Sequence, residues 1–371
     1  MKRVFEYDVN MAPESASDAE LVWHDAKEPI FGLYGSDALG EPGFSRLTEA
    51  ERNRIRPVND GEAWFAEHSA GIQVRFETDS SRICLRVKLR GKFDMTNMTQ
   101  IGQCGSDLYV CDERVGGYAL HEVARFPFDA AEYQVPLGHF DRAERKLRKY
   151  ILYLPLYMAT DKYEIGLDRQ AEVRPTGFSD PVRIGVYGTS ITHGCSASRP
   201  GMAYTNILSR KLDAEVLNFG FSGVAFMERE MGEILGRRRL DFLMVDTEAN
   251  AGIDQRLERN AEGFLDAFFS ENPGAGVVLF SRIPFALDLY DEYRAKLNKY
   301  YVSFLRGLAR RYVRRGYAID FCDASRCFRG NFTEYTADGI HPDDMGMVAI
   351  ARMYQRQFAL MKQKFHLGTT R

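Results

Sequence analysis

Two patterns of apolar and polar positions divide the chain. Residues 63–173 contain short runs in which apolar and polar residues alternate, separated by residues typical of turns. Residues 72–78 and 83–89 are the clearest runs, and Asp79-Ser80-Ser81 between them leads us to expect a hairpin with one buried and one solvated face. Further short strands are expected near residues 108–111, 118–125, 133–136, 148–154 and 162–167. Many short strands in succession are typical of an antiparallel β-sandwich of the jelly-roll type.

From Pro181 onward, apolar strands alternate with longer helical patterns. The strands are expected at residues 182–187, 215–219, 242–247, 276–281 and 317–322. The helices are expected near residues 201–212, 226–235, 254–270, 289–314 and 343–362. This alternation predicts an α/β domain with a five-stranded parallel sheet whose two faces are both covered by helices. Residues 174–180 are rich in breakers, so we expect a β-sandwich domain over residues 1–176 and an α/β domain over residues 177–371.

Composition narrows the classes of function. The 371 residues suffice for two domains, and 45% hydrophobic with 27% charged residues is an ordinary globular mixture. The net charge of −3 gives no reason to expect binding to nucleic acid. No stretch approaches the ~20 apolar residues of a membrane span, and the N-terminus lacks the apolar region of a signal peptide. Six cysteines without metal-site spacing indicate reduced thiols, so we expect a cytoplasmic protein, with a homo-oligomer left open.

Polar residues with catalytic potential follow the strands of the α/β half. Ser190 comes directly after the first strand, at an expected strand-to-helix turn. Asp338 and His341 lie within three residues of each other near the C-terminus. Because the carboxyl ends of parallel strands meet at one edge of a sheet, we expect these side chains and Asn250 to lie close together. A serine, a histidine that takes and returns its proton, and a carboxylate that orients the histidine are the parts that acyl transfer requires.

Each of these residues also has a purely structural interpretation. A serine before a helix is more often an N-cap than a nucleophile, and the segment from Asp338 to His341 fits a turn that leads into a helix. Asn218 and Asn250 would then satisfy backbone groups of loops. Cys195, close to the serine, is expected to pack as a small residue. The joint placement of these residues after strands of one sheet is what favours catalysis.

The motifs around these residues resemble the SGNH, or GDSL-type, hydrolases, a family of esterases and acylhydrolases. Gly188-Thr189-Ser190-Ile191-Thr192 is similar to the first block of that family, and Asn218-Phe219-Gly220-Phe221-Ser222-Gly223 is similar to the second. Glu248-Ala249-Asn250 stands where the third block carries its asparagine, and Asp338-Gly339-Ile340-His341 matches the last block. The resemblance implies a flavodoxin-like sheet and no metal or organic cofactor. It also implies a triad of Ser190, His341 and Asp338, and an oxyanion hole formed by Ser190, Gly223 and Asn250.

Two positions depart from the family pattern. Thr189 stands where the broad family usually has aspartate, and Glu248 places a carboxylate two residues before Asn250. An ionised Glu248 that points inward would oppose the oxyanion, so we expect it to face away, toward Arg199 or Arg282. Some family members orient their histidine through a backbone carbonyl, and for this reason the sequence predicts a much smaller loss of turnover in Asp338→Asn than in His341→Ala.

The resemblance extends to the first half of the chain. Gly105-Ser106-Asp107-Leu108-Tyr109 is similar to the Gly-x-Asp-Leu-Tyr signature of a β-rich domain that precedes one subfamily, and residues 197–204 resemble that subfamily's continuation of the first block. Related two-domain enzymes remove acetyl groups from carbohydrates. The resemblance therefore implies a serine esterase acting on a carbohydrate or similar small ester. The candidates for stacking on a sugar are Trp23, Trp64, Tyr109 and Tyr118, for which core packing is the simpler explanation.

Two further interpretations stay open. An acyltransferase that passes the acyl group to a sugar or another alcohol would use the same residues. A non-catalytic carbohydrate-binding protein on this scaffold would not need the intact set of Ser190, Asn250, Asp338 and His341. A small acyl group is favoured over a fatty acid because no amphipathic lid or long apolar loop lies near the motifs.

Overall fold

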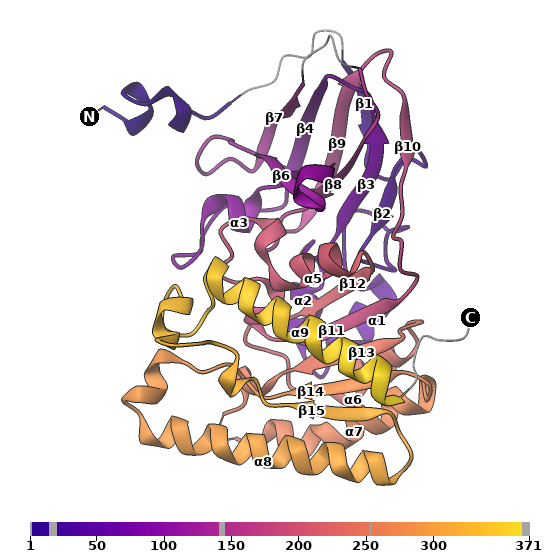
Figure 1. The fold of residues 1–371 in the computed structure, drawn as a ribbon, viewed down its shortest axis with the longest axis vertical. Helices are drawn as coiled ribbons and strands as arrows, with labels where there is room; N and C mark the ends of the chain where they lie inside the picture. Colours follow the sequence, from indigo (N-terminus) through magenta and orange to yellow (C-terminus); the bar gives the residue numbers. More distant parts are fainter. Residues whose placement is uncertain (1, 15–20, 141–144, 253, 366–371) are drawn as a thin grey trace.

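The first half of the chain forms two antiparallel sheets packed face to face (Figure 1). The computed structural model describes residues 2–14, 21–140, 145–252 and 254–365. One sheet has the strand order β1-β9-β4-β7, and the other has the order β10-β3-β8-β5-β6 with β2 beside β3. The strands are β1 (Leu21–Asp25), β2 (Gly32–Tyr34), β3 (Gln73–Thr78), β4 (Arg82–Leu89), β5 (Asp107–Asp112), β6 (Gly117–Val123), β7 (Glu132–His139), β8 (Arg148–Tyr153), β9 (Thr160–Asp168) and β10 (Val173–Pro175). The predicted β-sandwich is confirmed.

The predicted hairpin between residues 72–78 and 83–89 is wrong. β3 pairs with β2, β8 and β10 in one sheet, whereas β4 pairs with β7 and β9 in the other. The alternation correctly identified inward-facing residues such as Val74 and Phe76, but it contains no information on the partner strand. The other face of β3 is also buried, because Gln73 donates to Ser209 Oγ (3.3 Å) and Arg75 pairs with Asp213 (2.5 Å) in the second half of the chain.

The second half of the chain forms a five-stranded parallel sheet with the order β12-β11-β13-β14-β15. The strands are β11 (Arg183–Gly188), β12 (Glu215–Gly220), β13 (Phe242–Asp246), β14 (Gly276–Phe280) and β15 (Ile319–Cys322). In chain order the sheet reads 2-1-3-4-5, which is the flavodoxin-like arrangement. The helices are α4 (Ser190–His193), α5 (Tyr204–Leu212), α6 (Arg229–Gly236), α7 (Arg256–Glu271), α8 (Glu292–Arg314) and α9 (Asp344–Phe365). The predicted α/β fold is confirmed.

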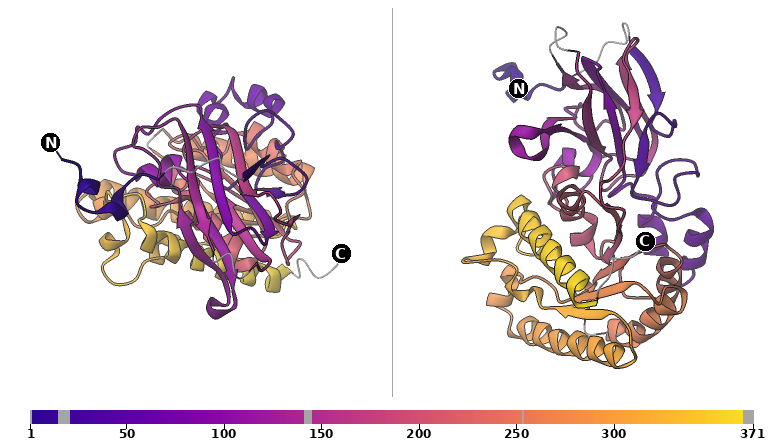
Figure 2. Two further views of the ribbon diagram at one scale, coloured as in Figure 1. Left: turned by 90° about the horizontal axis from the view of Figure 1, so that it is seen from above. Right: turned by 45° about the vertical axis from the view of Figure 1, so that its right-hand side comes forward.

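Successive residues of the parallel strands point to opposite faces, and both faces are apolar. In β13, Leu243 and Val245 pack toward α6, α7 and α8, whereas Phe242 and Met244 pack toward α5 and α9. Figure 1 shows α9 running diagonally across its face of the sheet. In the view from above, the sandwich lies over the α/β half (Figure 2). Among the described helices, none combines the length and the apolar character needed to cross a bilayer.

A segment between β2 and β3 packs into the α/β half although most of the sandwich strands follow it in the chain. It contains two helices that the sequence did not reveal, α1 (Glu49–Ile55) and α2 (Asp60–Phe65), while a third, α3 (Gln100–Cys104), lies before β5. Leu47, Ile55 and Ala63 belong to the same buried cluster as the apolar residues of α6 and α7. The domain boundary between residues 176 and 177 thus remains a prediction from the sequence, while the cores of the two halves share residues.

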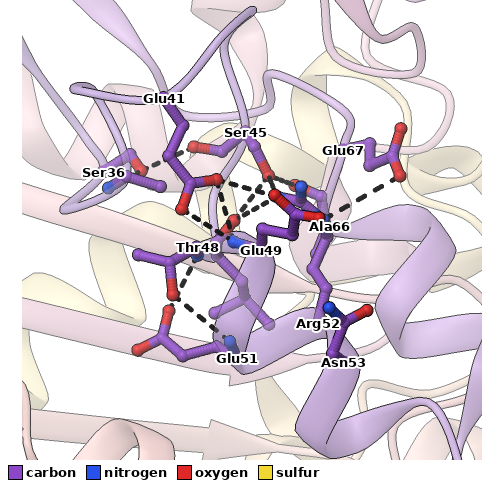
Figure 3. A network of polar contacts seen from close by, with 12 residues as sticks. Ser36, Glu41, Ser45, Thr48, Glu49, Glu51, Arg52, Asn53, Ala66 and Glu67 are labelled. Carbon is purple, nitrogen blue, oxygen red and sulfur yellow. Dashed lines mark hydrogen bonds and ion pairs between the residues drawn. The ribbon is translucent and has the colours of Figure 1, made fainter.

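Polar contacts fix the chain around α1 (Figure 3). Arg52 Nη1 donates to Ser45 Oγ (2.8 Å) and to the carbonyl of Leu47 (2.6 Å). Thr48 caps α1, because its hydroxyl accepts from the N–H of Glu51 (3.3 Å). These bonds hold the chain between Ser45 and Arg52 in place. Asn59, the N-cap of α2, donates from Nδ2 to the carbonyl of Val224 (2.7 Å) in the α/β half.

Arg46 joins this segment to the end of β12. Its side chain is fully buried, and its guanidinium donates to the carbonyl oxygens of His68 (3.0 Å), Asn218 (3.1 Å), Gly220 (2.7 Å) and Phe65 (2.5 Å). Burial lowers the pKa of Arg46 to about 9. The arginine therefore stabilises the carboxyl end of β12, from which the chain continues toward Gly223.

Candidate active site

Ser190 begins a short helix directly after β11. The N-cap of this helix is Thr189, whose hydroxyl accepts from the N–H of Ile191 (3.4 Å). Thr189 thus supplies the capping oxygen at the position where the broad family usually has aspartate. A side chain at Gly188 would place Cβ 2.1 Å from Thr192 Oγ1 and 2.6 Å from the carbonyl of Asp246, so the strand must end in glycine here. Because Thr189 does the capping, the hydroxyl of Ser190 remains available for chemistry.

The predicted histidine and aspartate meet the serine in a continuous chain of contacts. Ser190 Oγ lies 3.0 Å from His341 Nε2, and His341 Nδ1 lies 2.7 Å from Asp338 Oδ2. Burial acts to raise the pKa of Asp338, but hydrogen bonds from Asn97 and His341 outweigh it and lower this pKa to about 2. Asp338 is therefore ionised at neutral pH and holds a proton on Nδ1, so that in the uncharged ring Nε2 is free to accept the proton of Ser190.

The predicted oxyanion donors lie at the ends of neighbouring strands. Gly223 follows β12 and has a φ of 74°, in the left-handed region that glycine enters without strain. Asn250 follows β13, and its side-chain oxygen accepts from the N–H groups of Val224 (3.1 Å) and Ala225 (3.3 Å). This orientation leaves its NH₂ group as the donor toward the cavity that Ser190, Gly223, Asn250 and His341 line together. The backbone N–H of Ser190 lies in the first turn of α4, where it has no partner within the helix.

The side chains of Asn218 and Glu248 form contacts that hold the surrounding fold together. Asn218 Nδ2 donates to the carbonyl of Thr192 (2.7 Å) and to Thr205 Oγ1 (2.9 Å), which ties the end of β12 to α4. Glu248 faces Arg282, as expected, and accepts from the backbone N–H of that residue (3.0 Å). Burial raises the pKa of Glu248 to about 8, so this carboxyl is largely uncharged at neutral pH. At neutral pH Glu248 therefore adds little negative charge near the oxyanion hole.

Arg199, the other expected partner of Glu248, contacts the signature motif of the first half instead. Its guanidinium donates to Asp107 Oδ2 (2.8 Å), and the N–H of Gly201 donates to the same carboxylate (2.9 Å). A Cβ on Gly201 would lie 2.4 Å from Tyr109 Cε2 and 2.7 Å from Asp107 Oδ2. The two motifs of the subfamily resemblance thus bind each other across the boundary between the halves.

Two residues of the first half that the sequence analysis missed contact the proposed triad. Asn97 Nδ2 lies 2.8 Å from Asp338 Oδ2 and 3.3 Å from His341 Nδ1. Tyr157 donates from its hydroxyl to the carbonyl of Ser190 (3.3 Å), and its ring stacks on His193 at a centroid distance of 3.9 Å. Both residues lie in loops far from the motifs in sequence, and no spacing pattern singles them out.

Both halves of the chain line the cavity, which has a volume of about 770 Å³. Of the four aromatic residues considered for sugar stacking, only Trp64 lines it, with 57% of its surface exposed. Trp23 packs against Arg86, and Tyr109 is buried between Arg199 and Arg210. Tyr118 lies next to Arg75. These three residues do not line the cavity, and ordinary packing, the simpler explanation given for them, accounts for their positions.

Glu67, Arg90 and Lys92 at the rim of the cavity have ion-pair partners, whereas Asp94 accepts a hydrogen bond from Gln103 Nε2 (2.8 Å). Arg90 pairs with Glu67 and with Asp161 (2.7 Å), and Lys92 pairs with Asp129 (3.1 Å). Within the described part of the chain, no cluster of His, Cys, Asp and Glu side chains is arranged to hold a metal ion. Cys195 is a free thiol buried beside the histidine.

Comparison with known proteins agrees with this geometry. Residues 182–359 match the model of the GDSL-like lipase/acylhydrolase family, and residues 21–173 match the GxDLY model, described as the N-terminus of SGNH-hydrolase-type esterases. The chain belongs to the GDSL-like lipase/acylhydrolase family. No curated protein sequence matches it. The family resemblance inferred from the motifs is confirmed.

Solved structures show the same two-part fold as this GDSL-like hydrolase. A GDSL-like lipase from Bacteroides ovatus is 24% identical with a TM-score of 0.82, over 92% of this chain and 98% of that one. The salicylyl-acyltransferase SsfX3 from a tetracycline biosynthetic pathway is 16% identical with a TM-score of 0.69, over 93% and 98%. A family two carbohydrate esterase from Cellvibrio japonicus is 14% identical with a TM-score of 0.59, over 92% and 98%. At these identities the likeness establishes the fold alone.

Proposed function

We propose that the protein is a serine esterase that removes a small acyl group, with acetyl as the first candidate, from a carbohydrate or a similar small ester. The observation that carries the proposal is the chain of contacts from Ser190 Oγ through His341 to Asp338, with distances of 3.0 and 2.7 Å. Membership of the acylhydrolase family supports it independently.

The mechanism follows from this geometry. Ser190 Oγ attacks the ester carbonyl while His341 Nε2 accepts its proton, and the carbonyl oxygen becomes an oxyanion. The N–H groups of Ser190 and Gly223 and the NH₂ group of Asn250 stabilise that charge. The tetrahedral intermediate then expels the alcohol, which takes the proton from His341, and an acyl-enzyme remains. Water, deprotonated by the same histidine, attacks the acyl-enzyme and releases the acid with Ser190 restored.

The cavity supports an uncharged ester with a bulky alcohol part. Its volume of about 770 Å³ is far larger than an acetyl group requires and lies within the usual range for drug-sized ligands. Arg90 and Lys92 at its rim are paired, and the exposed ring of Trp64 offers an apolar face on which a sugar ring can stack. The name of the Cellvibrio japonicus esterase, a carbohydrate esterase, agrees with this class of substrate.

The test is a screen of acetylated mono- and oligosaccharides beside short-chain p-nitrophenyl esters, with released acid measured directly. Acetate release from at least one acetylated sugar, at a higher kcat/KM than from p-nitrophenyl acetate, is expected. Addition of an unacetylated sugar distinguishes hydrolysis from transfer, because an acyltransferase would then form a new ester in place of free acetate. Turnover of p-nitrophenyl acetate alone, with every sugar ester inert, would contradict the carbohydrate assignment.

Activity is expected to rise with pH well above neutrality. Burial by itself would lower the pKa of His341, but contacts with Cys195 and Asp338 outweigh it and raise this pKa to about 9. Only the neutral ring accepts a proton from Ser190, so on the order of 1% of the enzyme is in the active form at pH 7, and kcat/KM rises about tenfold per unit toward pH 9.

The profile of kcat/KM between pH 6 and 10, corrected for spontaneous hydrolysis, measures this ionisation. Cys195→Ala removes one of the contacts that raise the pKa of His341, so the midpoint should move to lower pH in that variant. A wild-type profile that is already flat at pH 7 would show that His341 titrates near its ordinary value.

A further inference from the structure

A second cavity of about 850 Å³ lies on the α/β half, between α9 and the segment that follows β15. Four arginines line it. Arg352 and Arg356 lie one turn apart on α9, and Arg326 and Arg329 come from the segment after β15. Two segments of the chain thus bring four exposed arginines to the lining of one hollow. No part of the proposed esterase mechanism uses them.

These four guanidinium groups are not neutralised by the protein. Within the described residues, none of the four has an ion-pair or hydrogen-bond partner, whereas Arg282, of similar chemistry, is held by Asp288 at 2.7 Å. The two carboxylates in the cavity are already engaged elsewhere. Asp344 accepts from the N–H (2.9 Å) and the hydroxyl (2.5 Å) of Ser198. Serine donors do not cancel the charge of the carboxylates, so four arginines and two aspartates leave the lining of the cavity with a net charge of about +2.

The second acidic residue, Asp323, is engaged in the same way. Its Oδ1 accepts from the hydroxyl (2.6 Å) and the N–H (3.1 Å) of Ser325, and its Oδ2 lies 3.7 Å from the guanidinium of Arg306, which is not one of the four. Burial raises the pKa of both Cys322 and Cys327 to about 12, so these thiols add no negative charge at neutral pH. The floor is apolar, with Met202, Val348 and Met353.

We propose that this cavity binds a phosphate group. Arginine presents a planar fork of N–H donors that matches two oxygens of a phosphate at once. Several arginines without ion-pair partners around one hollow supply the positive charge needed to bind a phosphate dianion. A ligand with a single carboxylate would leave most of these N–H donors without an acceptor. The apolar floor accommodates the remainder of a small molecule that carries the phosphate.

The position of the cavity allows two sources for the phosphate. A cavity of about 560 Å³ lies between the arginine cavity and the active site, since Asn97 lines it together with the active-site cavity, and Asp344 and Met345 line it together with the arginine cavity. The phosphate is therefore either carried by the far end of an acyl ester bound at Ser190 or part of a separate molecule. Binding itself does not depend on the proposed esterase activity, but the first of these two sources does.

Calorimetric titration of the full chain with inorganic phosphate and with pyrophosphate tests the site. Saturable binding is expected, weaker at higher ionic strength. The double variant Arg352→Gln/Arg356→Gln should bind at least ten times more weakly. Arg310→Gln/Arg314→Gln is the matched control, because these exposed residues lie four apart on α8, outside the cavity, and form no ion pair with any described residue. The affinity of this control should stay within twofold of wild type. Absence of saturable binding in the wild type, or equal affinity in both double variants, would overturn the proposal.

A second measurement separates the two sources. Acetyl-coenzyme A carries phosphates far from its thioester, and S-acetylpantetheine carries none. A preference for acetyl-coenzyme A in kcat/KM that disappears in Arg352→Gln/Arg356→Gln assigns the phosphate to the acyl donor. Binding of pyrophosphate without such a preference assigns it to a separate ligand. If neither thioester reacts while pyrophosphate still binds, the phosphate site stands and only its link to the proposed acyl chemistry is lost.

Discussion

Ser190→Ala is expected to lower the turnover of p-nitrophenyl acetate by about 10⁴- to 10⁶-fold. The hydroxyl of Ser190 lies 3.0 Å from His341 Nε2, and a methyl group at this position can neither attack the carbonyl nor donate a proton to the ring. The rest of the site stays intact, because Thr189 and not Ser190 caps α4. The measurement is release of p-nitrophenol under steady-state conditions, with free acetate determined in parallel.

Ser222→Ala is the matched control for this experiment. Ser222 also lines the cavity, but its hydroxyl is bonded to Tyr157, and no contact with His341 is formed. The same chemical change should therefore leave turnover within about tenfold of wild type, since only a neutral hydrogen bond is lost. Equal rates for wild type and Ser190→Ala would remove the serine from the mechanism and leave the family scaffold with another function.

Asp338→Asn is expected to lower turnover by about 10²- to 10⁴-fold, close to the loss in His341→Ala. The sequence alone predicted a much smaller effect, and the contacts around the carboxylate change that expectation. Oδ1 accepts from the N–H groups of Ile340 (3.0 Å) and His341 (2.8 Å), and Oδ2 faces His341 Nδ1 (2.7 Å) and Asn97 Nδ2 (2.8 Å). Every neighbour is a donor, so the NH₂ group of an asparagine has no acceptable position.

The consequence for His341 is a change of tautomer. If the new NH₂ group faces His341, the ring must accept on Nδ1 and carry its proton on Nε2, where it can no longer accept from Ser190. Asn97→Ala removes only one donor to the carboxylate and keeps the tautomer, so a loss of about tenfold is expected there. Steady-state kcat and KM of the three variants measure these effects. A loss below tenfold in Asp338→Asn would show that another group orients the histidine.

Much of the fold could be predicted because its patterns are local. In β13 the residues from Phe242 to Asp246 are all buried, as a strand between two helical layers requires, and the helices that cover it show a matching apolar stripe. The residues of the active site could be predicted for a related reason. Ser190, Gly223 and Asn250 each follow a strand of one parallel sheet, and parallel strands deliver such residues to a common edge.

The parts of the fold and of the site that the sequence did not predict depend on contacts between segments far apart in the chain. Which strand pairs with β3 is decided by the two-layer packing of the sandwich, and alternation of residues along β3 does not encode it. Asn97 reaches Asp338 across 241 positions, and nothing in its neighbourhood distinguishes it from any other loop asparagine. The helices α1 and α2 are short, at 7 and 6 residues, so their periodicity is too brief to recognise.

The buried guanidinium of Arg46 has a consequence for attempts to recombine this enzyme with its relatives. Its donors serve carbonyls on both sides of the boundary, at Phe65 and His68 and at Asn218 and Gly220, and Leu47 and Ile55 fill the core of the opposite half. A chimera spliced near residue 176 would leave the carbonyls of Asn218 and Gly220 without this donor and an apolar surface without its cover. Grafting a new sandwich onto this hydrolase therefore requires that residues 46–68 be inherited with the α/β half, although they precede most of the sandwich in the chain.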